Sequence, residues 1–195
     1  MGNSKYEAVT RRVYWDCEFT GLHKNTTLIS IALVGDDNAC FYAEFNDYSD
    51  EQVDNWIEEN IIDKLVMTHI DFDHTSKIDN VTYVKGGVSY IAKELDKWLS
   101  RYNSEMIEMW SDCLSYDWVL LVDLYGHAFN IPVNMYYIPF DICTLMKAYD
   151  IDPDINREEF IKSEGLMLNN NNKHNALHDT LVIKACHDKL IKLAK

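Results

Sequence analysis

The sequence predicts an α/β fold, with one mixed β-sheet flanked by helices. Three strand-like runs follow one another at short spacing (residues 10–19, 26–35 and 39–45), as in an antiparallel meander. Further strand-like runs then alternate with helical ones, an order typical of parallel strands joined by helices. Of the 195 residues, 47% are apolar, which supplies a core for a single domain spanning residues 1–195.

The first half of the chain contains the meander and two helices. Residues 10–19 alternate loosely between apolar and polar, whereas residues 26–35 are nearly all apolar, as expected of a central strand covered on both faces. Ser49 and Gln52 have the spacing of a capping box, so we expect a helix to begin there. The clearest helix spans residues 87–102, where one apolar stripe recurs at helical spacing: Val88, Ile91, Ala92, Leu95, Trp98, Leu99 and Tyr102.

The second half of the chain alternates strands with helices. We expect strands at residues 81–85, 105–111 and 134–140, and a helix at residues 116–129. Asp141 then has the place of an N-cap residue for the next helix. Further helices are expected at residues 142–150, 156–165 and 174–193.

Composition narrows the class of protein. No apolar stretch reaches the length of a membrane span, about 18 residues or more, and the first residues lack the apolar segment of a signal peptide. We therefore expect a cytoplasmic protein. The five cysteines are scattered without a C-x-x-C pair, which indicates neither a zinc site nor a disulfide framework. The net charge of −14 argues against a basic nucleic-acid surface, although an acidic metal site counted without its metal contributes to that charge.

Two acids one residue apart, Asp16 and Glu18, stand near the end of the first expected strand. Because side chains in a strand alternate between faces, both carboxylates project from the same side. Two such charges about 4 Å apart repel by roughly 4 kcal/mol at an effective dielectric constant near 20. Exposure at a sheet edge, a basic partner or a bound divalent cation would relieve this repulsion, and hard oxygen ligands suit Mg²⁺ and Mn²⁺.

Other residues are candidates to complete such a site. His174 and Asp179 lie five residues apart at the start of the last helix, and a histidine beside a carboxylate-held metal can take a proton from water. The alternative is that His174 is a surface residue. Asp117 opens a helix directly after a strand, although an acid in a first turn also interacts favourably with the helix dipole. Asp112 competes for the same role, and we prefer Asp117 because the apolar stripe of that helix begins beside it.

In their order along the chain, the candidate acids and His174 resemble the three motifs of the DEDDh 3′–5′ exonucleases. The acids are Asp16, Glu18, Asp117 and Asp179. This superfamily includes RNase T, oligoribonuclease and the proofreading subunit of bacterial replicative polymerases. The segments VYWDCEFTGL, YDWVLL and HNALHD resemble its first, second and third motifs, and the third reads H-x-A-x-x-D. The resemblance spans about residues 12–185 and is closest to the small stand-alone exoribonucleases. It implies a ribonuclease H-like fold with a mixed five-stranded sheet.

The resemblance also implies a site and a reaction. His174 would be the general base, and four acids would hold two divalent metal ions, Mg²⁺ or Mn²⁺. These metal-binding and catalytic acids are Asp16, Glu18, Asp117 and Asp179. The implied reaction is hydrolysis of phosphodiester bonds from the 3′ end of single-stranded RNA or short oligonucleotides. Two alternatives stay open: a DNA exonuclease of the proofreading type, and a non-catalytic nucleic-acid-binding module of the same fold.

The residues after the first motif are implied to bind the terminal nucleotide, with Leu22 as a wedge between the last two bases. They are Phe19, Thr20, Gly21 and Leu22. Relatives of this kind often form homodimers, and we expect the same here. One departure from the motif is His178, an unusual polar residue directly before Asp179. Weaker candidates are Trp110, Tyr116 and Trp118 for base stacking, and Arg11, Arg12, Lys24 and Lys173 for phosphate contacts.

Overall fold

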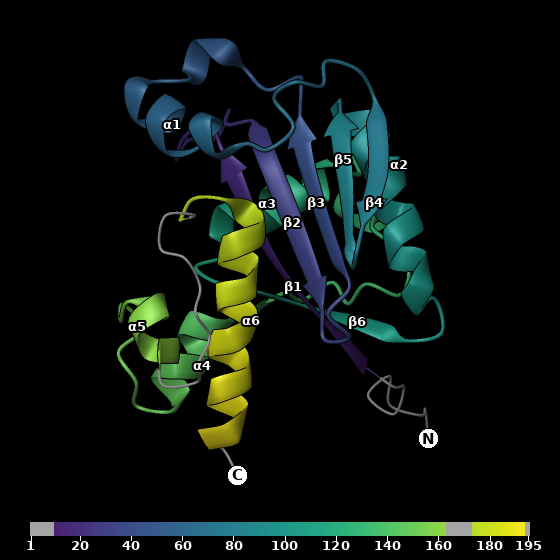
Figure 1. The fold of residues 1–195 in the computed structure, drawn as a ribbon. Coiled ribbons are helices and arrows are strands. Elements are labelled where there is room, and N and C mark those ends of the chain that lie inside the picture. The colour runs from purple at the N-terminus through teal and green to yellow at the C-terminus, as the bar shows by residue number, and fades with distance from the viewer. Residues whose placement is uncertain (1–9, 163–172, 194–195) are drawn as a thin grey trace.

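A mixed sheet of seven strands forms the centre of the computed structural model, which describes residues 10–162 and 173–193 (Figure 1). The strand order is β4-β5-β3-β2-β1-β6-β7. Strands β1, β2 and β3 pair antiparallel in sequence order, which confirms the predicted meander. The pairs β1–β6, β6–β7 and β3–β5 are parallel, so the predicted mixed sheet is confirmed as well. The strands are β1 (Thr10–Phe19), β2 (Leu28–Gly35), β3 (Cys40–Phe45), β4 (His74–Ile78), β5 (Val81–Gly86), β6 (Met106–Ser111) and β7 (Phe140–Asp141).

Helices cover both faces of the sheet. Helix α6 runs along β1 and β2, with α4 and α5 beside it, whereas α2 and α3 lie behind the sheet in the same view (Figure 1). Among the described residues, the helices are α1 (Asn55–Asn60), α2 (Val88–Leu99), α3 (Ser115–Asp123), α4 (Ile142–Ala148), α5 (Arg157–Ile161) and α6 (Ala176–Leu193). No helix in these parts of the chain is both long and apolar enough to span a membrane.

The molecule has a hydrophobic core on each face of the sheet, and the side chains of β1 contribute to both. Val13, Trp15 and Cys17 pack with apolar residues of α2 and α3. Tyr14 lies in the other core, with residues of α4, α5 and α6. The alternation of a strand therefore directs Asp16 and Glu18 toward the α6 side. Because β1 and β6 are parallel, their carboxyl ends meet at the same edge of the sheet.

The count of strands differs from the five that the resemblance implies. Strand β4 has the sequence HTSKI and is mostly exposed, so it lacks the apolar pattern that identifies a strand. The strand predicted at residues 134–140 is wrong for most of its length. Only Phe140 belongs to β7, and Met135 makes an isolated bridge to Ile107. Pro139 has no N–H group to donate to a ladder, which limits strand formation in this stretch.

Two predicted helix boundaries also differ. The capping box is wrong, because the Ser49 side chain makes no capping hydrogen bond and Asp54 instead accepts one from the N–H of Ile57 at the start of α1. The helix predicted at residues 116–129 ends at Asp123, as the end of α3, and Gly126 follows with a φ of +69°. The predicted N-cap Asp141 is confirmed: its side chain accepts from the N–H of Cys143. The end of the helix predicted at residues 156–165 lies outside the described residues.

Candidate active site

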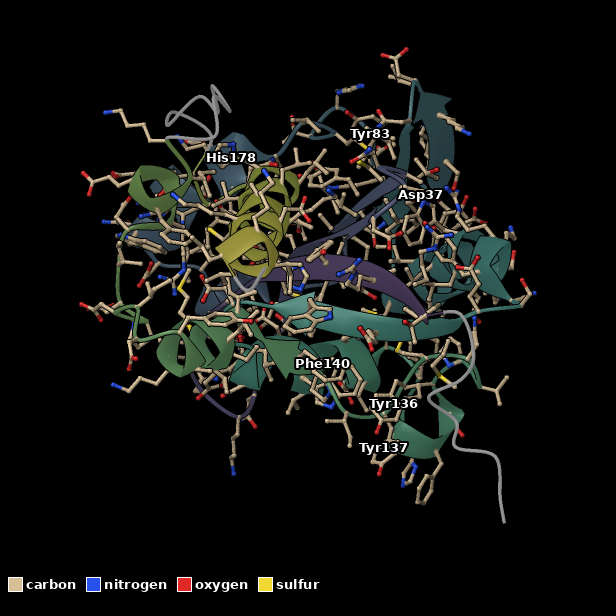
Figure 2. The ribbon with its side chains drawn as sticks, turned by 90° about the horizontal axis from the view of Figure 1, so that it is seen from below. Asp37, Tyr83, Tyr136, Tyr137, Phe140 and His178 are labelled. Atoms are coloured by element: carbon tan, nitrogen blue, oxygen red, sulfur yellow. The ribbon has the colours of Figure 1, made fainter. Side chains whose placement is uncertain are left out.

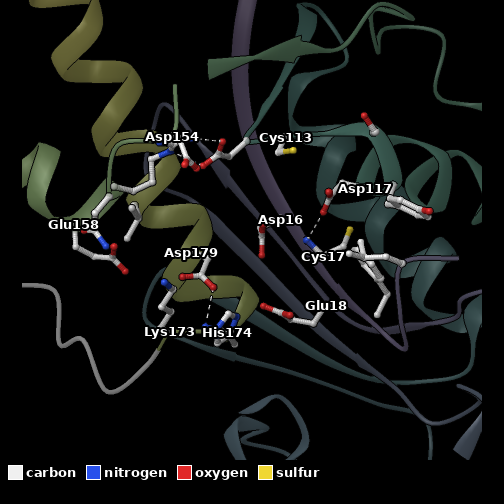
Figure 3. A pocket seen from close by; sticks show the side chains of 18 of the residues that line it. Asp16, Cys17, Glu18, Cys113, Asp117, Asp154, Glu158, Lys173, His174 and Asp179 are labelled. Carbon is white, nitrogen blue, oxygen red and sulfur yellow. Dashed lines mark hydrogen bonds and ion pairs between the residues drawn. The ribbon is translucent and has the colours of Figure 1, made fainter. Parts of the chain in front are cut away.

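A cleft of about 760 Å³ opens at the carboxyl end of β1, between α3, α5 and the start of α6 (Figure 3). All five of the residues proposed for catalysis line it: Asp16, Glu18, Asp117, His174 and Asp179. They come from three segments of the chain. The fold thus brings together the three sequence motifs in one concave site.

The first two segments are joined by a hydrogen bond. The backbone N–H of Cys17, between Asp16 and Glu18, donates to Oδ1 of Asp117 at 3.0 Å. Glu18 and Asp117 are 9% and 7% exposed, so this contact lies at the buried floor of the cleft. It fixes the start of α3 against the end of β1.

The third segment adds a histidine and an acid. His174 has a φ of +65°, a left-handed conformation that is uncommon outside glycine, and its N–H donates to Oδ2 of Asp179 at 2.9 Å. Ligand atoms of Glu18, His174 and Asp179 all lie within 4.8 Å of one another. The Trp56 ring packs edge-on against the imidazole of His174, with the ring centroids 5.2 Å apart. The turn before α6 therefore presents the imidazole beside two carboxylates.

The acids of the site have strongly perturbed proton affinities. Burial, and then repulsion from Asp179 and Asp117, raises the pKa of Glu18 to about 8. Burial also raises the pKa of Asp179 to about 7, although the N–H of His174 opposes the shift. The pKa of Asp117 rises to about 6 through burial, opposed by the N–H of Cys17. Burial and neighbouring acids raise the pKa of Asp16 well above its usual value.

Burial is the main cause of all four shifts, and repulsion from the other acids adds to it at Asp16 and Glu18. Among the ion pairs of residues 10–162 and 173–193, none involves one of the four acids. Buried carboxylates are normally paired or bind metal. A set of hard oxygen donors is also the chemistry that divalent cations such as Mg²⁺ prefer. The residues of the cleft therefore fit a divalent metal site.

Asp112, the competitor of Asp117, already has a cationic partner. Arg157 donates to it from Nε to Oδ2 at 2.6 Å and from Nη2 to Oδ1 at 2.9 Å. The thiol of Cys143 donates to the same Oδ1 at 2.9 Å. Sequence reasoning did not identify Arg157, because it lies 45 residues from Asp112 and belongs to no motif.

The residues expected to bind the nucleotide divide into two groups. Phe19 and Leu22 line the cleft, and Leu22 is 77% exposed. Phe19 also stacks on Tyr116, with centroids 5.7 Å apart. Thr20 is buried, and its hydroxyl donates to Oε1 of Gln52 at 2.5 Å. Gly21 adopts a φ of +151°, which only glycine tolerates easily.

Most of the weaker candidates are engaged elsewhere. Trp110 stacks on Phe140 at 4.8 Å, and Trp118 contacts Trp15 edge-on at 6.0 Å. Arg11 forms ion pairs with Asp36 and Glu105, and Arg12 lies 3.9 Å from Asp36. Lys173 lines the cleft. The residues of the cleft that the sequence patterns did not identify include Asp154, Asn156, Arg157 and Glu158, which precede or open α5 without forming a recognisable pattern.

Comparisons with known proteins show the fold and the family of the chain. The chain resembles the solved nuclease domain of 3′hExo, described as a DEDDh family member bound to rAMP, with a TM-score of 0.65 and 11% sequence identity over 97% of this chain and 94% of that chain. No curated protein matches the chain. The 3′–5′ exoribonuclease Rv2179c-like domain matches residues 11–190. The DEDDh resemblance and the ribonuclease H-like fold are thus confirmed, and the chain belongs to the Rv2179c-like family of 3′–5′ exoribonuclease domains.

Proposed function

We propose that the protein is a metal-dependent 3′–5′ exoribonuclease that shortens single-stranded RNA or short oligonucleotides. The observation that carries this proposal is the cluster of four acids, two of them buried and two half-buried, and one histidine in the cleft. The raised pKa values of the four acids suit a site that receives positive charge. The family supports a 3′–5′ exonuclease, and the RNA preference and metal count below are our inferences.

Asp16, Glu18, Asp117 and Asp179 would hold two divalent cations, Mg²⁺ or Mn²⁺. When bound, two such ions stabilise the charge on the attacking and leaving oxygens of an in-line displacement. Four carboxylates carry a charge of −4, which two divalent cations cancel. An anionic phosphodiester can then approach a cleft that would otherwise repel it.

His174 is proposed as the general base. Burial, and then the charges of Lys173 and Lys64, lowers the pKa of this histidine. Its imidazole is therefore neutral near pH 7 and can accept a proton at a ring nitrogen from the attacking water. The bond from its N–H to Asp179 holds the residue beside the acids. The water oxygen then forms the new bond to phosphorus, and the bond to the leaving 3′-oxygen of the preceding nucleotide breaks.

The wall of the cleft suits a terminal nucleotide. A volume of about 760 Å³ lies in the range of small-molecule sites. Phe19 and the exposed Leu22 offer apolar contacts to bases, while Thr20 and Gly21 would shape the turn between them. Because the chain carries a net charge of −14, it has little basic surface to hold long nucleic acids. Short single-stranded ends, anchored at the metals, are the substrates that fit best.

We also propose a homodimer in the cytoplasm. Three large apolar side chains in the chain segment between α3 and β7 are strongly exposed: Phe129, Val133 and Tyr137, at 93%, 98% and 70%. Figure 2 shows Tyr136, Tyr137 and Phe140 in this part of the molecule. A partner subunit that covered these side chains would remove their apolar surface from water. All five cysteines are unpaired, as is usual in a reducing compartment.

Cleavage of matched RNA, DNA and dinucleotide substrates tests the proposal. A 5′-labelled RNA should lose nucleotides from its 3′ end in Mg²⁺ or Mn²⁺, and chelator or Asp16→Asn should abolish the reaction. Faster shortening of DNA than of RNA would favour a proofreading-type enzyme. Tight RNA binding without cleavage would favour a non-catalytic module. Equal products from wild type and Asp16→Asn would contradict the proposed site.

A further inference from the structure

A second cluster of potential metal ligands lies beside the catalytic acids. Ligand atoms of Glu158, His178 and Asp179 all lie within 4.8 Å of one another. Glu158 comes from α5, and the other two residues come from the first turns of α6. Figure 3 shows Glu158 on the Asp179 side of the cleft, and Figure 2 labels His178 beside α5. The cluster shares Asp179 with the site described above.

His178 is the unusual member of this cluster. It is only 7% exposed, and its Nε2 atom is buried without a hydrogen-bond partner in the described parts of the chain. Buried polar side-chain atoms are nearly always hydrogen-bonded, so an unpartnered nitrogen on a ring that lies close to two carboxylates calls for an explanation. A bound cation supplies one, since it would coordinate the imidazole and neutralise the acids.

The position of Glu158 is held by its neighbours. Asn156 caps α5, and its side chain accepts from the N–H of Glu159 at 2.9 Å. Arg157 is held by Asp112 and also donates to the carbonyl of Pro153 at 2.7 Å. Later in α5, Phe160 packs in the core shared with α6. The carboxylate of Glu158 is thus carried on a fixed turn.

We infer that Glu158, His178 and Asp179 form a third cation site, which takes a transition-metal ion such as Zn²⁺. Zn²⁺ binds imidazole and carboxylate ligands together, whereas Mg²⁺ prefers oxygen ligands alone. Occupation of this site would draw Asp179 away from Glu18 and His174. The ion would therefore inhibit the nuclease. The inhibition rests on the proposed function, and the binding does not.

Calorimetric titration of the folded protein with Zn²⁺ in saturating Mg²⁺ tests the binding. Wild type should bind Zn²⁺ in one event that Glu158→Gln and His178→Gln weaken by at least about tenfold, since even loss of an outer-shell partner costs about 10- to 100-fold in metal affinity. The matched control is Glu159→Gln, an exposed neighbour in the same helical turn, which should bind like wild type. Equal affinity in Glu158→Gln and Glu159→Gln would overturn the site, even if His178→Gln fails to fold.

A second variant separates this site from zinc bound by the catalytic acids. Glu18→Gln leaves Glu158, His178 and Asp179 intact, so the Zn²⁺ event should persist. Loss of the event in Glu18→Gln but not in Glu158→Gln would place the zinc among the catalytic acids and refute the inference. In NMR spectra of the histidine rings, Zn²⁺ should shift the signal that is missing in His178→Gln. An unchanged His178 signal would equally refute it.

Inhibition is measured separately. If the protein degrades RNA, Zn²⁺ should inhibit wild type and Glu159→Gln at concentrations at least about tenfold lower than those needed for Glu158→Gln, matching the change in affinity. If no RNA is degraded but the calorimetric pattern holds, the proposed function fails and the cation site stands. If RNA is degraded but the Zn²⁺ event is absent, the proposed function stands and the cation site is refuted.

Discussion

The carboxylate of Asp117 accepts a hydrogen bond from the backbone N–H of Cys17, which precedes it by 100 residues. Cys17 stands between the two acids of β1, so this bond sets the position of the second motif relative to the first. The contact is buried, which makes Asp117 a structural as well as a chemical residue of the site. Its two roles can be separated by substitution.

Asp117→Asn keeps an oxygen that can accept from Cys17 but removes the charge, whereas Asp117→Ala removes both. We expect each variant to lose nuclease activity by at least about 10²-fold, the typical loss of an electrostatic group in an active site. Only Asp117→Ala should be destabilised, by about 1–3 kcal/mol, because it leaves a buried N–H unpaired. Urea unfolding in chelator measures this difference, with the exposed Asp123→Asn at the other end of α3 as control. Equal stability of Asp117→Ala and Asp117→Asn would contradict it.

The metal-free protein should become less stable as the pH rises. The folded pKa values of Asp117, Asp179 and Glu18 are raised to about 6, 7 and 8, whereas the unfolded chain titrates near its usual value of about 4. Between about pH 4 and about pH 8 the folded state binds more protons than the unfolded state. The free energy of unfolding therefore falls as the pH rises through this range. Thermal unfolding in chelator measures this fall.

Variants and metal identify the groups responsible for that pH dependence. Glu18→Gln should show a smaller fall than wild type, and the exposed Glu51→Gln should not differ from wild type. Mg²⁺ should raise the unfolding temperature more at about pH 8 than at about pH 5, because it replaces protons on the acids. A fall in stability that Glu18→Gln leaves unchanged would contradict this explanation.

His174→Gln should reduce the rate of RNA hydrolysis by about 10²- to 10⁴-fold, the usual contribution of a general base. Binding of Mg²⁺ by calorimetry should remain, because the four acids are intact. The exposed His69→Gln is the matched control and should retain the wild-type rate. A rate for His174→Gln within a few-fold of wild type would remove this residue from the proton transfer.

Leu22→Ala tests the wall of the substrate pocket. Leu22 lines the cleft and is 77% exposed, so a base that packs on it would cover apolar surface. We expect KM for an oligonucleotide to rise by about 4- to 15-fold, equivalent to one or two buried methylene groups, with little change in kcat. Ile78→Ala, at an exposed apolar residue of β4, should leave KM unchanged. Equal KM values for wild type and Leu22→Ala would exclude the contact.

Local sequence patterns predicted the first three strands of the sheet. The runs that became β1, β2 and β3 were identifiable because buried strands are apolar or alternate. Strand β4 was missed because its side chains are mostly exposed, so tertiary pairing with β5 rather than burial defines it. The capping box failed because Gln52 bonds instead to Thr20 and to the carbonyl of Asn25, contacts that come from distant segments.

The acids of the site were predictable for a similar reason. Asp16 and Glu18 stand out because charges in an apolar strand need compensation, and His174 and Asp179 stand in a recognisable spacing. The partner of Asp112 could not be predicted, since the ion pair with Arg157 joins the first residue of α5 to the residue directly after β6, two segments far apart in the sequence. The approach of Glu158 to His178 and Asp179 could not be predicted either, because it results from tertiary packing alone.

The central claim is that divalent cations compensate the charge of four acids from three segments. Calorimetric titration with Mg²⁺ at about pH 9 tests it most directly, since this pH lies above the pKa values of Asp117, Asp179 and Glu18, which are about 6, 7 and 8. We expect wild type and Asp123→Asn to bind two Mg²⁺ ions per chain, and Asp16→Asn to lose this binding. Absence of Mg²⁺ binding to wild type, or the same binding in Asp16→Asn, would contradict it.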